Sequence, residues 1–453
     1  MGYDISYDQI AGWDEDLRLL TERVAGSLFT RPEPRATFAD LVRGLLADVP
    51  RKNSWQLAEH VGHGSAHRLE WLLGGAKWDA DALRDRVRDY VVATLGAEDG
   101  VLIADDTQVI KKGVKSVGVA PQHCGATGQT ENCQVLPMLS YASARGHAFL
   151  DRALYLPRRW TEDPQRCAQA GVPVERGFAT KPQLVIDMLD RALAAGVPFR
   201  YFTADSGYGR DPGLRARCHA AALAYVLAVP VDLPLVEPAG GATRPDRVRA
   251  MAPKAVWERR SCGAGTKGER SYDWAAVAVT VKDQPPAEGH GHTLLIRRSV
   301  SDPAEIEFFL AHAPDPTPIP ELIAVAGMRW KIEENNAGQG PARPRPVPGP
   351  QVDPLAPARE RLHAGPRLPR RHPRPAGKRP TAPAAAKGLL TPPRLIRPSL
   401  AEIRRLLART LLAAADGIDH ILHWSLFRRL HQTRALISHY RRRGDPIPAE
   451  LRM

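Results

Sequence analysis

The sequence predicts an α/β protein with a central mixed sheet flanked by helices, a β-rich insertion, and helical regions at both ends. Three observations carry this prediction. Apolar residues recur at helical spacing over residues 1–97. From Val101 onward, three buried runs come in succession and further runs then alternate with amphipathic segments, as in a mixed sheet covered by helices. Residues 389–453 again have apolar residues at helical spacing, together with many basic side chains.

The N-terminal region predicts several short helices. Trp55–Gly62 is a short helix with a glycine stop, Ala66–Leu73 is a second, and Asp79 caps a third that runs to about Leu95. Two short helices around a glycine-containing turn fit a helix-turn-helix that reads DNA, and they fit an ordinary helical bundle equally well. Both interpretations stay open.

The central region supplies the predicted sheet. Its first strand, Val101–Ala104, ends on Asp105, and a later strand, Phe199–Ala204, ends on Asp205. The other expected elements are strands over 116–120, 134–141 and 224–229 and helices over 180–194 and 213–222.

Short β-prone runs such as Trp274–Val281 predict a small β-rich insertion. Helices are expected over Ala304–His312 and Glu321–Glu334, and a capping box at Ser399 and Glu402 predicts another. The expected regions are a helical, DNA-binding segment 1–97, a catalytic core in two parts (98–232 and 303–337), the insertion 233–302, a Pro/Arg-rich segment 338–388, and a basic helical region 389–453.

Composition favours an anionic partner, nucleic acid first, because the net charge is +13. Much of this charge is local, since residues 341–383 hold ten Lys and Arg against two Asp and Glu.

The five cysteines form no CxxC pair, so reduced thiols are expected and a zinc site is not. With no apolar run near the roughly 18 residues of a membrane span and no signal pattern, we expect a cytoplasmic, nucleoid-associated protein without a membrane partner.

Three acids stand out by their positions. Asp105 and Asp205 each end a predicted strand, and Glu333 lies on a predicted helix beyond the insertion. If the two strands are neighbours, their ends bring both aspartates together and the helix can lay Glu333 across them. Three converging carboxylates suit Mg²⁺. Each acid alone is as well explained by a turn, a cap or a solvated helix surface, so the combination carries the prediction.

Several motifs are similar to those of bacterial insertion-sequence DDE transposases, within the DDE superfamily of endonucleases. They span about residues 95–336 and comprise Asp105-Asp106-Thr107 with Lys111-Lys112-Gly113, Asn132-Cys133-Gln134, Leu154-Tyr155-Leu156-Pro157 with Trp160, Thr180-Lys181-Pro182, Asp205-Ser206 with Tyr208-Gly209, Gly263 to Trp274, and Arg329 to Glu334. The resemblance implies an RNase H-like core and a catalytic, metal-binding triad of Asp105, Asp205 and Glu333. It also implies two Mg²⁺ ions, for which Mn²⁺ can substitute, and a homodimer on terminal inverted repeats and target DNA.

The resemblance also implies DNA contacts near the active site. Arg329 matches an arginine of the family's final helix, whereas Ala326 stands where a tyrosine is expected and the family's lysine would fall near Gly340. Lys111, Lys112 and Lys267 are further candidate phosphate contacts, although ordinary surface is the better explanation for any single one of them.

The segment after Glu333 breaks the helical pattern. Residues 341–383 contain 13 prolines and no Phe, Trp or Tyr. GC-rich coding DNA read in a wrong frame gives mostly Pro, Arg, Ala and Gly, so we favour a pair of compensating frameshifts near 337 and 388 over a genuine Pro-rich linker. The expected protein is a transposase, in a copy that a frameshift would inactivate. The alternatives are a DNA-binding remnant without catalysis and a host nuclease without strand transfer.

Overall fold

The computed structural model describes residues 7–125, 127–265 and 268–331, and, near the C-terminus, 406–408, 411–412, 418–443 and 446–447. The segment 338–388, Glu333 and the start of the helix expected at Ser399 lie outside the described residues. No helix in the described part of the chain is both long enough and apolar enough to cross a membrane.

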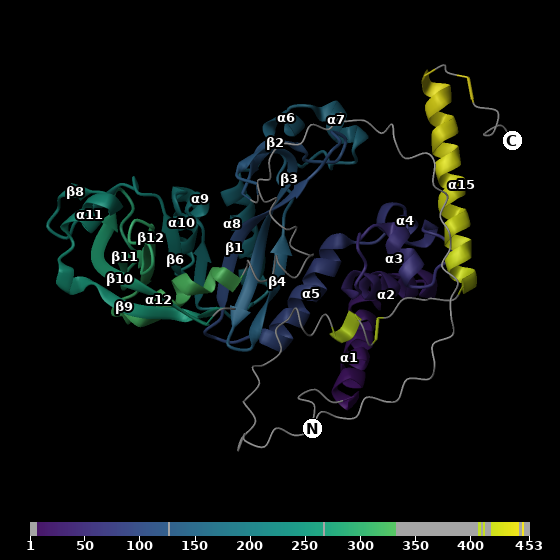
Figure 1. The fold of residues 1–453 in the computed structure, drawn as a ribbon. Helices are drawn as coiled ribbons and strands as arrows, with labels where there is room; N and C mark the ends of the chain where they lie inside the picture. The colour runs from purple at the N-terminus through teal and green to yellow at the C-terminus, as the bar shows by residue number, and fades with distance from the viewer. Residues whose placement is uncertain are drawn as a thin grey trace, which may run out of the picture.

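The N-terminal region is helical, as predicted (Figure 1). Local capping explains where two of its helices begin: the Asn53 side chain accepts a hydrogen bond from the Gln56 backbone N–H, and Asp79 caps the backbone at Asp81 and Ala82. The helices are α1 (Tyr7–Ala25), α2 (Pro32–Leu46), α3 (Ser54–His60), α4 (His67–Gly74) and α5 (Ala80–Leu95). Whether α3 and α4 read DNA stays a prediction.

A mixed sheet follows, formed by β1 (Val101–Ile110), β2 (Ala120–Cys124), β3 (Gln129–Ser143), β4 (Gly146–Arg152), β5 (Tyr201–Ala204) and β6 (Ala224–Val229). Its first part runs antiparallel, because β3 pairs with β1, β2 and β4. The strands β5 and β6 are parallel to β1, in the order β3-β1-β5-β6. The crossovers between them contain α8 (Lys181–Ala194) and α10 (Pro212–Ala220). This confirms the predicted α/β class with a mixed sheet flanked by helices.

The β-rich insertion extends the same sheet. Its elements are β7 (Leu235–Val236), β8 (Ala242–Thr243), α11 (Pro245–Met251), a 3-10 turn (Lys254–Val256), β9 (Glu258–Gly265), β10 (Gly268–Val281) and β11 (His290–Ser299). Strand β12 (Ile306–Pro314) lies between β11 and β6 and joins the insertion to the core. The helix α12 (Ile319–Met328) then returns to the sheet.

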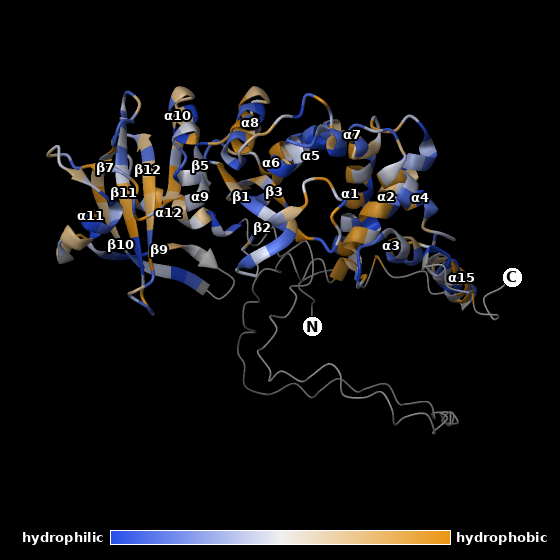
Figure 2. Ribbon diagram, turned by 90° about the horizontal axis from the view of Figure 1, so that it is seen from above, coloured by the Kyte–Doolittle hydropathy of each residue, from blue (hydrophilic) through white to orange (hydrophobic). Residues whose placement is uncertain are grey.

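Two apolar cores cover the two faces of the sheet. On one face, Leu102, Ala104 and Phe202 pack with residues of α8 such as Val185 and Met188. On the other face, Val101, Ile103 and Tyr201 pack with Leu322 and Val325 of α12. Figure 2 shows apolar residues along the strands where helices cover them. Alternation along β1 therefore decides which face each later side chain of that strand meets.

The C-terminal helix α15 (Ile418–Arg443) packs against the N-terminal helices, at the opposite end of the molecule from the insertion (Figure 1). Trp424 is fully buried in a third core with Leu57 and Leu69, and its indole N–H donates to the His63 carbonyl at 2.9 Å. The two ends of the chain thus form one helical unit.

Two predicted elements are wrong. Residues 304–312 were expected as a helix, but Ile306–Pro314 forms strand β12, buried between β6 and β11. A short apolar run such as Phe308–Ala311 fits a buried strand and a buried helix alike. Residues 116–119 are a loop, and the strand in this part of the chain is Ala120–Cys124.

Candidate active site

Asp105 and Asp205 come together on two adjacent parallel strands. Asp105 lies within β1, which continues to Ile110 and does not end at Ala104 as predicted, whereas Asp205 directly follows β5. Ala104 of β1 pairs with Ala204 of β5, so the two aspartates follow at the same level. Side chains alternate along a strand, and Ile103, two residues before Asp105, faces α12. Asp105 therefore points to the α12 face, with Asp205 beside it.

Charges on this face act on Asp105. The pKa of its carboxyl is raised to about 6, chiefly by burial and to a lesser extent by the neighbouring Asp205, while the backbone N–H of Asp106 and the Arg329 guanidinium oppose the rise. Arg329 follows α12 directly, so the end of this helix places a cation close enough to lower the pKa of Asp105. Glu333 itself lies outside the described residues.

One oxygen of each aspartate is held by the backbone. Asp105 Oδ1 accepts from the Asp106 N–H at 2.7 Å, and Asp205 Oδ1 accepts from the N–H groups of Gly207 and Tyr208 at 2.9 and 3.2 Å. Asp205 thereby caps the short helix α9 (Ser206–Gly209). Within the described part of the chain, neither Oδ2 has a hydrogen-bond donor, so both keep a carboxylate oxygen for a ligand.

This donor set fits a divalent cation. The free carboxylate oxygens of Asp105 and Asp205 are hard ligands of the kind that Mg²⁺ prefers. Burial and repulsion from Asp205 both disfavour the ionised form of Asp105. A bound cation would stabilise that form and so offset both effects.

Asp106 lies next in sequence but points to the opposite face. Its Oδ2 accepts from Lys181 Nζ at 2.5 Å and its Oδ1 from the Tyr208 hydroxyl at 2.6 Å. Lys181 is the first residue of α8, on the face opposite α12. Both Asp106 oxygens therefore accept hydrogen bonds from protein side chains. In this respect Asp106 differs from Asp105, which keeps one oxygen for a ligand.

The loop 111–119 lies beyond the end of β1 and carries Lys111 and Lys112. Side chains from the motifs described above hold its backbone, since Asn132 donates to the carbonyl of Lys111, Gln134 to that of Val117, and Trp160 to that of Val119. Several motif residues are thus structural. Lys112 is exposed and Lys111 partly so, whereas Lys267 lies outside the described residues.

A tight backbone approach explains Gly209 of the motif Tyr208-Gly209. A Cβ at this position would lie 1.9 Å from the Ala228 carbonyl oxygen of β6. Only glycine lets α9 pack this closely on the sheet.

The family model described as DDE superfamily endonuclease matches residues 26–291. The chain belongs to this family. The match includes Asp105, Asp205 and most of the insertion, and it ends before α12.

A second comparison relates this DDE family member to a probable transposase for insertion sequence element IS701 of Microchaete diplosiphon. The two are 29% identical over 186 residues, which is 41% of this chain and 46% of the relative. The chain thus spans about half the length of that relative. Among solved structures, the NurA nuclease from Sulfolobus solfataricus aligns over 55% of this chain and 80% of its own, with 10% identity and a TM-score of 0.25.

A histidine cluster in this DDE family member was missed from the sequence, because its members are far apart in the chain. His219 of α10, His292 of β11 and His312 of β12 have ring nitrogens within 4.8 Å of one another. The rings of His219 and His312 stack at 4.1 Å, and His290 stacks on His312 at 4.6 Å. Both His312 nitrogens bond to backbone, one with the Leu223 carbonyl and one with the Ala287 N–H. Metal ligands need lone pairs that converge in the ring planes, so we interpret the cluster as a stack of neutral imidazoles.

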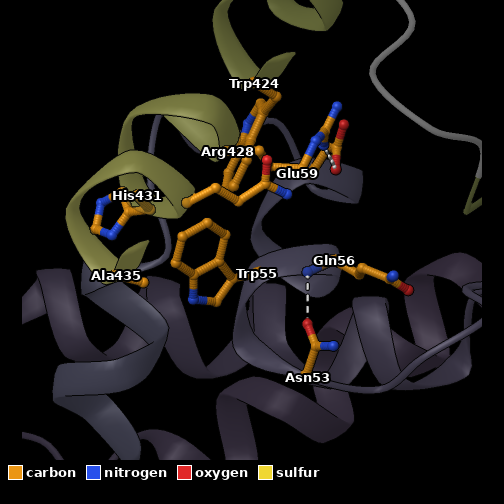
Figure 3. A pocket seen from close by; sticks show the side chains of 9 residues that line it. Asn53, Trp55, Gln56, Glu59, Trp424, Arg428, His431 and Ala435 are labelled. Atoms are coloured by element: carbon orange, nitrogen blue, oxygen red, sulfur yellow. Dashed lines mark hydrogen bonds and ion pairs between the residues drawn. The ribbon is translucent and has the colours of Figure 1, made fainter. Parts of the chain in front are cut away.

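A groove of about 640 Å³ lies between α3 and α15, away from the strands that carry the aspartates. Figure 3 shows Trp55 and Arg428 along it, with Arg428 paired to Glu59. Trp55 also packs its ring on Phe427 and His431 of α15. The groove is part of the joint between the two ends of the chain.

Proposed function

We propose that this chain is an insertion-sequence transposase that cuts DNA at the ends of its element and joins the 3′ ends to a target. The observation that carries the proposal is the pair Asp105 and Asp205, at matched positions on adjacent parallel strands, on the face of α12. Membership of the DDE endonuclease family and similarity to a probable transposase support the same reading.

In this proposal Asp105 and Asp205 hold Mg²⁺, with Glu333 as the third acid, and two ions are bound in the complete site. Divalent ions there would activate a water or a 3′ hydroxyl and stabilise the leaving oxygen of a phosphodiester. The protein's own contribution is placement: the backbone N–H groups of Asp106, Gly207 and Tyr208 orient the two carboxylates.

Positive side chains around the site are suited to the DNA backbone. Arg329 lies near enough to Asp105 to affect its charge, and Lys111 and Lys112 are on the loop beyond β1. We propose that these three residues, with Lys267, contact phosphates. A homodimer on paired inverted repeats, in the nucleoid, completes the proposal.

The test uses the purified full chain and a linear DNA that carries the sequences flanking its gene. If this copy is active, cleavage at the element ends and joining to a second DNA occur with Mg²⁺ or Mn²⁺, and Asp105→Ala abolishes both reactions. Cleavage without joining would instead identify a nuclease. Binding of the ends without cleavage in either ion would identify a DNA-binding remnant.

A further inference from the structure

We propose that Asp106, Lys181 and Tyr208, named here the Asp106 clamp, are positioning residues that set the relative placement of the Asp105 and Asp205 carboxylates. The inference rests on the proposed function, because it concerns the same metal site. It assigns Asp106 a role other than that of ligand and gives Lys181 and Tyr208 a part in metal binding.

The clamp joins three elements through one carboxylate. Asp106 belongs to β1, Lys181 begins α8, and Tyr208 lies in α9, directly after β5. The Asp106 side chain is 16% exposed and bonds to Lys181 at 2.5 Å, while the Tyr208 hydroxyl, on a residue only 3% exposed, donates to it at 2.6 Å. A carboxylate this enclosed costs solvation unless it is paired, and here both oxygens have partners.

The link to the metal site runs through the backbone of the same residues. The Asp106 N–H donates to Asp105 Oδ1, and the Tyr208 N–H donates to Asp205 Oδ1. The side chains of Asp106 and Tyr208 are bonded to each other on the far face of the sheet. The two residues that orient the two candidate ligands are therefore tied together.

The Asp106 clamp fixes the distance between the two carboxylates that would bind a cation. Two carboxylates of like charge repel, so their separation without a metal depends on the scaffold that holds them. Breaking the bond between Tyr208 and Asp106 frees α9 to move relative to β1, which changes the distance between the two ligands. Residues that orient metal ligands typically contribute about 10- to 100-fold to metal affinity or activity.

The test measures Mn²⁺ binding by the full chain, from the loss of the free-ion signal in electron paramagnetic resonance. Tyr208→Phe removes only the hydroxyl, and we expect it to weaken Mn²⁺ binding by about 10-fold or more. Asp106→Asn keeps an acceptor for Tyr208 and loses the charge opposite Lys181, so a smaller loss is expected. Tyr201→Phe is the matched control, because the Tyr201 hydroxyl also donates to a carboxylate, Glu321, at 2.7 Å, but toward α12.

The outcomes separate the clamp from the function on which it rests. If wild-type protein binds Mn²⁺ with an affinity that depends on Asp105, and Tyr208→Phe and Tyr201→Phe both bind like wild type, the clamp is wrong and the metal site stands. If wild-type protein shows no Mn²⁺ binding that Asp105→Ala abolishes, both proposals fail. A loss confined to Tyr208→Phe and Asp106→Asn, with thermal unfolding matched to the control, supports the clamp. If Tyr208→Phe does not fold, Lys181→Met takes its place, with the smaller loss expected for Asp106→Asn and the same control.

Discussion

Asp105 and Asp205 each follow by one residue the paired Ala104 and Ala204 of the adjacent parallel strands β1 and β5. The match in level follows from the parallel register, and the match in face follows from strand alternation. Two carboxylates are thus held side by side, directly after a stretch of β1, Val101–Ala104, that is buried and apolar. Such a placement is unfavourable for two anions alone and favourable for two ligands of one cation site.

Asp105→Asn and Asp205→Asn should each lower Mg²⁺-dependent DNA cleavage by about 100-fold or more, because losing a metal ligand removes several kcal/mol of charge stabilisation. The melting temperature should stay the same or rise, since the pKa of Asp105 is raised by burial and by Asp205. Cleavage assays and thermal unfolding measure the two effects. The exposed Asp187→Asn on α8 is the control and should cleave like wild type. Equal activity in all three variants would remove these aspartates from the site.

The sequence singles out Asp105 and Asp205 because their signals are local. A buried run that ends on an acid marks both Asp105 and Asp205, and the motifs around them identify the family. The Asp106 clamp gives no such signal, since Lys181 meets Asp106 only after α8 packs against the sheet. Strand β12 was missed for a related reason: Phe308 and Phe309 are buried on opposite faces, so the run has no alternation to detect.

Acid should destabilise the joint between the insertion and the core. Burial, together with neighbouring histidines, lowers the pKa of His292 to about 3 and of His312 to about 4, against about 6.5 in an unfolded chain. The unfolded state therefore binds more protons between these values, so stability is present above about pH 6.5 and falls as the pH drops toward 4. The groups that face the stack act in the same direction: His219 lowers the pKa of both His292 and His312, Arg215 lowers that of His292, and His290 lowers that of His312.

Melting temperatures at pH 7.5 and pH 5 measure this dependence. His292→Leu removes one of the titrating groups and a buried ring nitrogen, Nε2, that has no partner among the described residues. The variant should lose less stability than wild type on acidification. An unchanged difference between the two pH values would show that the stack does not control acid stability.

Trp424→Ala should detach the C-terminal helix from the N-terminal helices. The side chain is fully buried and its N–H is bonded to the His63 carbonyl, so truncation should cost about 3–5 kcal/mol. Limited proteolysis should then cut near α15 sooner than in wild type. Leu422→Ala, at a side chain that is 61% exposed on the same helix, should change stability by less than about 0.5 kcal/mol. Similar cleavage of both variants would contradict the packing described here.

Gly209→Ala should destabilise the protein by about 3 kcal/mol, because the new Cβ would lie 1.9 Å from the Ala228 carbonyl oxygen and force α9 away from β6. Gly74→Ala in α4 is the control, since no atom lies within 4 Å of its Cβ position and alanine favours a helix. Denaturant unfolding compares the two. If Gly209→Ala is as stable as Gly74→Ala, the close approach of α9 to β6 is wrong.

Resequencing the DNA across codons 330–395, with translation in all three frames, tests the origin of the Pro/Arg-rich segment. Buried residues of α12, including Leu322, Ile323 and Ala326, pack on the sheet at helical spacing, and a continued catalytic helix should keep this pattern beyond Lys331. We expect another frame to supply it, together with a lysine near position 340. C-terminal to the segment, Trp424 and Leu412 pack in the core of the N-terminal helices. Such packing is expected of residues that are translated in the original reading frame. If no other frame has this periodicity, the segment is a genuine insertion, and the cleavage assays above apply to the chain as it stands.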